Sequence, residues 1–199
     1  SAMFLLVAVV GCRDHGHEPR VDAPAPSIAT EAPASTSAST AAVVGADYRA
    51  MGTTISMKVY TDREMAARAA MLDAKLEIDR LEAMMSTWRE DSEVAHINRA
   101  AGSPERVAIS PDLSAVLHAA RTMYDQSFGV FDITFAALQG LWRFDEGVTP
   151  TVPTDADLSA RLPLIAGNAV ELDERAQTAR LPRKGMAINL GGIAKGYAV

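Results

Sequence analysis

Hydrophobic and polar residues first alternate regularly near the start of the expected domain. Apolar Ile55, Met57 and Val59 are separated by polar residues, which is the period-two pattern of a half-buried strand. Thr61-Asp62 then caps a predicted long helix over residues 63–85. The apolar stripe expected to face the core on this helix consists of Met65, Ala69, Leu72, Leu76 and Leu81.

The later part of the chain predicts a mixture of short helices and strands. Ser110-Pro111-Asp112 combines a cap, a proline in the first turn and an acid near the helix dipole, and therefore begins a helix that ends at Gly129. The other predicted elements are a short helix from Asp91 or Ser92 to Arg99, a helix from Pro153-Thr154-Asp155 to Leu162, paired strands at 169–172 and 178–181, and a strand from Met186. This order predicts an α+β fold with helices layered on a mixed sheet, whose remaining strands are expected beyond Val199.

Composition narrows the function only by exclusion. The chain has 199 residues, of which 48% are hydrophobic and 22% charged, as expected for one globular domain with tails. Its net charge of −6 and lack of basic clusters argue against a nucleic-acid partner. The single cysteine, Cys12, excludes an internal disulfide framework and a cysteine-based zinc site.

The N-terminal residues resemble the end of a lipoprotein signal. An apolar run at 3–11 is too short to span a bilayer as a mature helix, and Val9-Val10-Gly11-Cys12 resembles a lipobox. Residues 1–12 are therefore interpreted as a signal remnant in which Cys12 is lipidated. The alternative is an apolar start with a chance cysteine.

A segment rich in Pro, Ala, Ser and Thr follows at 13–46. It has little large apolar surface to offset the entropy of ordering, so we expect a disordered tether. The folded domain is expected at 47–199.

The last stretch, residues 186–199, is predicted to be a buried strand, a glycine turn and the start of a helix. Gly191 and Gly192 permit close approach of a ligand, and a helix N-terminus with Lys195 nearby is suited to a phosphate. The pattern is neither a nucleotide P-loop nor G-x-G-x-x-G. The alternative is a turn without a ligand.

Two further residues each allow two interpretations. Trp88 lies in a charged loop, where its ring either packs against the protein or stacks on a bound heterocycle. Asp132 is enclosed by apolar and β-branched residues and needs a partner. It either caps a neighbouring backbone segment or meets a donor on a ligand.

Four stretches taken together resemble the ApbE family of FAD:protein FMN transferases, over about 48–199. They are Met51-Gly52-Thr53, then Met85-Ser86-Thr87-Trp88 with Asp91-Ser92-Glu93 and Asn98, then Phe131-Asp132-Ile133-Thr134, and Asn189-Leu190-Gly191-Gly192-Ile193-Ala194-Lys195-Gly196-Tyr197. The resemblance implies an ApbE-like, T-fold-like domain. It also implies an enzyme that uses Mg²⁺, cleaves FAD, releases AMP and attaches FMN to a Thr or Ser of a target protein.

The resemblance also implies roles for individual residues. Those implied to contact FAD are Met51, Trp88, Arg89, Glu90, Asp132 and Lys195. The Gly192 backbone carbonyl is implied to be a magnesium ligand. Catalytic residues and the remaining magnesium ligands are expected beyond Val199, so we expect this chain to be an incomplete, apparently truncated domain that is inactive alone.

The implied target is a flavoprotein subunit of a membrane redox complex. The implied location is the bacterial cell envelope, with the protein held by lipid on Cys12 at the periplasmic side of the inner membrane. Two alternatives remain open: an enzyme that hydrolyses FAD to FMN and AMP, and a non-catalytic flavin-binding lipoprotein.

Overall fold

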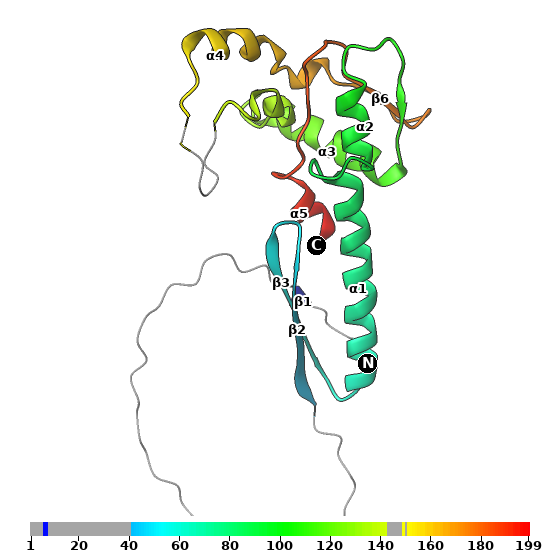
Figure 1. Ribbon diagram of the computed structural model, residues 1–199. Coiled ribbons are helices and arrows are strands. Elements are labelled where there is room, and N and C mark those ends of the chain that lie inside the picture. Colours follow the sequence, from blue (N-terminus) through cyan, green and yellow to red (C-terminus); the bar gives the residue numbers. More distant parts are fainter. Residues whose placement is uncertain (1–5, 8–40, 143–148, 150) are drawn as a thin grey trace, which may run out of the picture. The chain divides into compact units, whose positions relative to one another are not determined.

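The computed structural model describes residues 6–7, 41–142, 149 and 151–199. The described residues fall into two compact units, divided between Ala74 and Lys75, and helix α1 (Glu64–Met85) contributes to both. The predicted α+β class is confirmed, because helices accompany two small sheets in which every pairing is antiparallel (Figure 1).

The first unit is built on a β-hairpin. Strand β2 (Ala42–Ala50) pairs along its length with β3 (Thr53–Thr61), and the two-residue strand β1 (Leu6–Val7) pairs with β3 on its other edge. Met51 and Gly52 connect β2 to β3 with φ angles of 50° and 70°. A two-residue loop with both φ angles positive is the type I′ turn, whose twist matches that of paired strands. Because β2 begins at Ala42, the predicted tether and domain boundary at 46–47 is too late.

The buried positions of β3 were predicted better than those of α1. Ile55, Met57 and Val59 are buried, as their alternation predicts. The expected stripe on α1 is wrong except at Leu81, since Met65, Leu72 and Leu76 are exposed and Ala69 is exposed too. The residues that α1 buries are Ala67, Met71, Ile78, Leu81, Met84 and Met85. Ala67, Met71 and Ile78 lie two residues after Met65, Ala69 and Leu76 of the predicted stripe, so the buried face is turned by about half a turn of the helix.

Local capping signals set the helices of the second unit. Helix α2 (Glu93–Arg99) begins at Ser92, whose Oγ accepts from Ala95 N, and α3 (Pro111–Gln126) begins at Ser110, whose Oγ accepts from Leu113 N. Helix α4 (Asp155–Arg161) begins with a reciprocal capping box between Thr154 and Asp157. All three predicted starts are confirmed, because each depends on hydrogen bonds within four residues.

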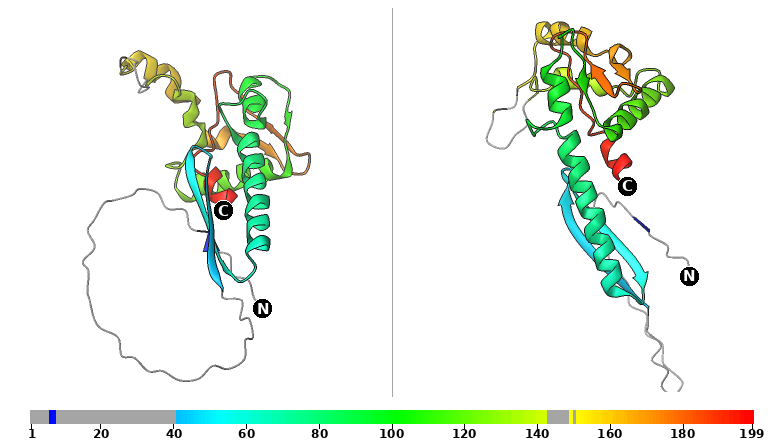
Figure 2. Two further views of the ribbon diagram at one scale, coloured as in Figure 1. Left: turned by 60° about the horizontal axis from the view of Figure 1, so that its bottom comes forward. Right: turned by 90° about the vertical axis from the view of Figure 1, so that its right-hand side faces the viewer.

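A second three-stranded sheet has the order β4-β6-β5. The predicted hairpin is confirmed as β5 (Glu171–Asp173) and β6 (Thr178–Arg180), and β4 (Val107–Ala108) pairs with β6. Helix α3 lies against β5 and the short 3-10 helix η3 (Gly167–Ala169) (Figure 2). Two further 3-10 helices, η1 (Ile133–Leu138) and η2 (Leu162–Leu164), contact each other.

The strand predicted from Met186 is wrong. Residues 186–190 have no strand partner among the described residues, although Met186, Ile188 and Leu190 are almost completely buried. Their backbone instead bonds to the Asn98 side chain and to the Ile133 carbonyl. The predicted glycine turn and helix do follow, the helix being α5 (Ala194–Ala198).

The core of the second unit lies among α2, α3, η1 and the 186–190 segment. Its most buried side chains are Val94, Ile97, Leu113, Val116, Thr134, Leu181, Met186, Ile188 and Leu190. No helix in the described part of the chain is long and apolar enough to cross a bilayer.

Candidate functional site

The loop that carries Trp88 is held by its own hydrogen bonds. Trp88 N donates to Ser86 Oγ at 3.1 Å, and Ser92 Oγ donates to the Ser86 carbonyl at 2.6 Å. The Trp88 side chain is nevertheless 88% exposed, so the packing interpretation of this residue is wrong. A fixed backbone therefore presents a free indole ring to solvent.

A pocket of about 500 Å³ opens beside this ring, within the range of small-ligand sites. It is lined by Thr87, Trp88, Arg89, Glu90, Ala95, Asn98 and Arg99. The three loop residues predicted to contact FAD thus share one pocket.

Arg89 and Asp91 form an ion pair in this loop. Arg89 donates to both carboxylate oxygens of Asp91, at 3.1 and 2.8 Å, and Arg99 donates to the Glu90 carbonyl at 2.6 Å. The hydrogen bond from Arg89 holds the pKa of the Asp91 carboxyl below its ordinary value. The pocket therefore combines an aromatic wall with a charged and polar rim.

Three of the four motifs converge on residues 188–192. Asn98 Nδ2 donates to the Ile188 carbonyl at 3.0 Å, and Ile188 N donates to Asn98 Oδ1 at 2.8 Å. One residue further on, Asn189 N donates to the Ile133 carbonyl at 2.9 Å. The Trp88 pocket, the motif around Asp132 and the glycine turn are thereby joined directly.

Asp132 caps neighbouring backbone, the first of its two predicted interpretations. Its Oδ1 accepts from Thr134 N at 2.7 Å and from Thr134 Oγ1 at 2.6 Å, while Oδ2 accepts from Gly167 N at 2.9 Å. The buried Thr134 Oγ1 in turn accepts from Ala166 N at 2.8 Å. The corner is tight, because a Cβ on Gly167 would lie 2.7 Å from Tyr124 Cδ2.

The glycine turn relies on close packing rather than on unusual backbone angles. Neither Gly191 nor Gly192 has a positive φ. A Cβ on Gly191 would lie 3.0 Å from Asn189 Oδ1, and one on Gly192 would lie 3.2 Å from Phe131 Cε2. The Lys195 side chain is exposed, with its Nζ 3.4 Å from the Gly191 carbonyl.

An apolar pocket of about 410 Å³ adjoins the glycine turn. Its walls come from α3, from Phe131 and from the start of α5, and its lining is Val116, Ala119, Met123, Phe131, Gly192, Ile193, Gly196 and Tyr197. Apolar surface is therefore available next to the predicted phosphate and metal groups, Lys195 and the Gly192 carbonyl.

A charged network fixes α5 against α3. Tyr197 Oη donates to Asp112 Oδ1 at 3.0 Å, and Arg80 donates to Asp112 Oδ2 at 2.7 Å while also pairing with Glu77. The hydrogen bonds from Arg80 and then Tyr197 lower the pKa of Asp112. Burial, followed by the bond to Asp112, raises the pKa of Tyr197.

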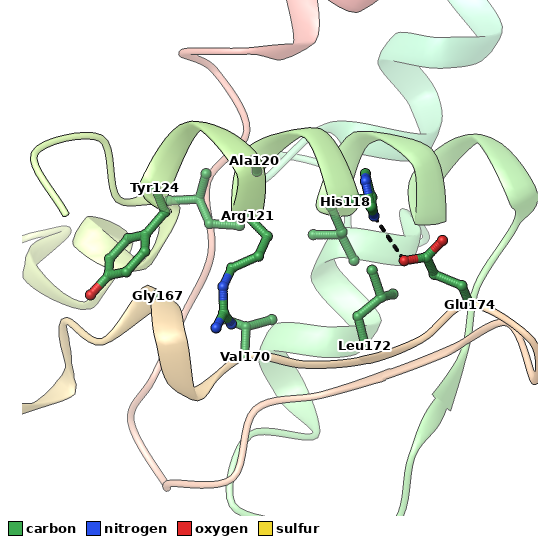
Figure 3. Close-up of a pocket in the computed structure, with 10 residues that line it drawn as sticks. His118, Ala120, Arg121, Tyr124, Gly167, Val170, Leu172 and Glu174 are labelled. Atoms are coloured by element: carbon green, nitrogen blue, oxygen red, sulfur yellow. Dashed lines mark hydrogen bonds and ion pairs between the residues drawn. The ribbon is translucent and has the colours of Figure 1, made fainter. Parts of the chain in front are cut away.

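A smaller pocket of about 210 Å³ lies between α3 and the η3–β5 segment (Figure 3). His118 and Glu174 face each other across it with 2.8 Å between Nδ1 and Oε1, while Arg121 donates to the Asn168 carbonyl at 3.2 Å. His118 and Arg121 both have partners in the protein, and none of the residues predicted to bind FAD lines this pocket. We interpret it as part of the packing interface between α3 and the η3–β5 segment.

The structure says less about the other predicted site residues, Met51 and Cys12. Met51 is half-buried at the tip of the hairpin in the first unit. Cys12 and the lipobox lie outside the described residues. In the part of the chain that the structure describes, no three His, Cys, Asp or Glu side chains are grouped to hold a metal.

Sequence reasoning missed the residues that position the site. The roles of Asn98, Asp112 and Tyr197 were not predicted, although Asn98 and Tyr197 lie within the quoted motifs. Asn98 directly follows buried Ile97, and a polar amide next to a buried position is the only local signal of its function.

Comparison with known proteins identifies the family. The ApbE family model matches residues 51–199. The chain is similar to a FAD:protein FMN transferase of Klebsiella pneumoniae (strain 342), with 34% identity over 149 residues, which are 74% of this chain and 45% of that protein. It is also similar to a FAD:protein FMN transferase of Haemophilus influenzae, with 27% identity over 162 residues, 79% of this chain and 47% of that protein.

Solved structures agree with this comparison. The flavin transferase ApbE from Vibrio cholerae matches with a TM-score of 0.71 and 27% identity, over 80% of this chain and 51% of that one. The ApbE protein from Thermotoga maritima matches with a TM-score of 0.67 and 25% identity, over 79% of this chain and 50% of that one. The chain thus spans about half the length of the relatives it matches.

Asp132→Asn tests the corner at Gly167. The amide must point its NH₂ group at the N–H of either Thr134 or Gly167, so at least one hydrogen bond is lost and two donors face each other. We expect the free energy of unfolding to fall by about 1–3 kcal/mol, measured by urea denaturation. Asp125→Asn, which removes only an exposed pair with Arg121, should change it by less than about 1 kcal/mol. Equal effects of the two variants would contradict the capping role.

Acid should loosen α5 through Asp112. The folded-state pKa of this carboxyl is lowered, so its bonds stabilise the fold above the unfolded pKa of about 3.9 and are lost as pH falls through the lower folded value. We expect the Tyr197 ring resonances in NMR spectra to shift below about pH 4. Asp112→Asn should show the shifted resonances already at pH 7, whereas Asp125→Asn should keep the wild-type pH dependence. Wild-type Tyr197 resonances that do not change with pH would refute the coupling between Asp112 and Tyr197.

Proposed function

Because this chain belongs to the ApbE family, we propose that the protein is a FAD:protein FMN transferase. The observation that carries the proposal is the hydrogen-bonded convergence of three family-like motifs on residues 188–192, beside an open pocket with an exposed indole. The names of the matched relatives support the same activity.

The proposed reaction transfers FMN from FAD to a Thr or Ser hydroxyl of a flavoprotein subunit of a membrane redox complex. The hydroxyl oxygen attacks the phosphorus of the FMN half, and the bond from that phosphorus to the bridging oxygen breaks. AMP leaves with the bridging oxygen and its electron pair, and the hydroxyl releases its proton. Hydrolysis to free FMN is the same displacement with water as the acceptor.

The described residues have distinct proposed parts in this reaction. Trp88 provides a flat surface for stacking the isoalloxazine ring, with Arg89 and Glu90 at the rim of the same pocket. Lys195 provides positive charge for the pyrophosphate. Met51 is proposed to contact the flavin nucleotide on the strength of the resemblance alone.

For Asp132 the geometry favours an indirect part. Both of its carboxylate oxygens already accept hydrogen bonds from the protein. We propose that it supports FAD binding chiefly by fixing the backbone around Ile133, whose carbonyl accepts a hydrogen bond from Asn189 N.

Magnesium fits the described residues only in part. The Gly192 carbonyl is a single neutral oxygen, and Mg²⁺ requires carboxylate or phosphate oxygens as well. No acidic cluster able to complete such a site occurs within 41–142, 149 and 151–199. The described residues therefore do not form a magnesium site, and no step of the reaction is assigned to the ion.

Trp88→Ala, made in the full-length protein, tests the flavin pocket. Loss of one stacked ring should weaken FAD binding about 5- to 150-fold, since stacking contributes about 1–3 kcal/mol, measured by flavin fluorescence titration. Trp88→Phe should retain most of the affinity, and Trp142→Ala, at a tryptophan outside the pocket, should retain all of it. Unchanged affinity in Trp88→Ala would remove Trp88 from the site.

Intact mass spectrometry of an acceptor protein incubated with FAD tests the reaction itself. An acceptor mass gain equal to FMN is expected, and Lys195→Ala should abolish it. Free FMN and AMP with an unchanged acceptor would assign the hydrolase activity instead. Intact FAD and an unchanged acceptor would refute both.

We further propose that Cys12 is lipidated and holds the protein at the inner membrane, facing the periplasm. The apolar run before Cys12 and the Pro/Ala/Ser/Thr segment after it support this proposal. In a bacterial host, Cys12→Ser should abolish labelling by a fatty-acid probe and release the protein from the membrane fraction. Fatty-acid labelling that persists in Cys12→Ser would refute lipidation at this residue.

A further inference from the structure

Helix α3 ends in a Schellman motif with an unusual residue at its centre. Gly129 N donates to the Tyr124 carbonyl at 2.8 Å and Phe128 N donates to the Asp125 carbonyl at 3.3 Å. Phe128 therefore occupies the C′ position, with φ at 55°. This position favours glycine, and a bulky side chain there is strained.

The same residue is also exposed to water. Phe128 is 97% exposed and Val130, two residues later, is 89% exposed. Glycine or asparagine at position 128 would relieve both the strain and the exposure. A residue that is unfavourable in two independent ways points to a function outside the fold.

The loop that carries these side chains is held in place. Ser127 Oγ accepts from Phe131 N at 2.9 Å and donates to the Tyr124 carbonyl at 3.2 Å, and Val130 N donates to the Ser127 carbonyl at 3.2 Å. An aromatic side chain on a fixed backbone loses little entropy when a partner covers it, and such residues often dominate binding at interfaces.

The loop lies at the edge of the candidate site. It connects Met123 on α3 to Phe131, and both residues line the apolar pocket beside the glycine turn. Phe131 packs directly on Gly192. The loop therefore borders the surface beside the turn that is proposed to hold the phosphate.

We propose that Phe128 and Val130 form a docking knob for an apolar side chain of the acceptor polypeptide. This inference rests on the proposed transferase function and adds the surface that receives the protein substrate. Charge disfavours an anionic membrane as the partner, because residues 127–130 contain no basic side chain and the net charge is −6.

Phe128→Gly separates docking from folding. Glycine is the favoured residue at C′, so this variant should unfold at a higher urea concentration than the wild type. Its KM for the folded acceptor should nevertheless rise about tenfold, as for loss of an interface hot spot. FAD affinity, and FMN transfer to a short peptide that carries only the acceptor hydroxyl and its immediate neighbours, should be unchanged.

Two exposed valines provide a matched pair. Val130→Ser should also raise the KM for the folded acceptor, whereas Val152→Ser, at a valine that is 85% exposed elsewhere, should not. An unchanged KM in Phe128→Gly would overturn the inference. Weaker binding of Phe128→Gly to phosphatidylglycerol vesicles, with an unchanged KM, would overturn it in favour of a membrane contact.

Direct binding of the acceptor, measured without FAD, separates this inference from the proposed function. Wild-type binding that Phe128→Gly weakens, without any FMN transfer, would uphold the docking knob and refute the transferase. If the wild type transfers FMN and Phe128→Gly transfers it equally efficiently, the transferase would be upheld and the docking knob refuted.

Discussion

The pair of hydrogen bonds between the Asn98 side chain and the Ile188 backbone is the constraint on which the rest of the site depends. The bonded residues are 90 positions apart in the sequence. Ile188 is completely buried without a neighbouring strand, and a buried backbone N–H and carbonyl require partners. By supplying both, Asn98 holds the segment that places the glycine turn against Phe131 and α3.

Asp132 applies the same chemistry at the next corner. A carboxylate and the Thr134 hydroxyl satisfy the N–H groups of residues 134, 166 and 167, where no sheet is available to do so. The backbone that supports Asn189 is therefore fixed before any ligand binds. Such preorganisation is what a phosphoryl-transfer site requires, because its catalysis depends mainly on positioning.

Two turns carry strained residues next to family-like motifs. Met51 in the hairpin turn and Phe128 after α3 both have positive φ angles at positions that favour glycine or asparagine. In each case the fold tolerates the strain because the surrounding hydrogen bonds determine the turn: strand pairing at Ala50 and Thr53, and the Schellman bonds at Phe128. The side chains at these turns then become available for contacts other than folding.

The sequence alone determined the helix starts at Ser92, Ser110 and Thr154, the β5–β6 hairpin and the family, because caps, turns and motifs act over a few neighbouring residues. It placed Trp88, Arg89 and Glu90 correctly in one loop. It did not determine the buried face of α1, the partners of the segment at 186–190 or the choice between two interpretations of Asp132. The partners of residues 186–190 and the role of Asp132 were decided by tertiary contacts with Asn98, Ile133 and Gly167. The buried face of α1 was likewise decided by packing, since burial and hydrogen-bond satisfaction depend on residues distant in the chain.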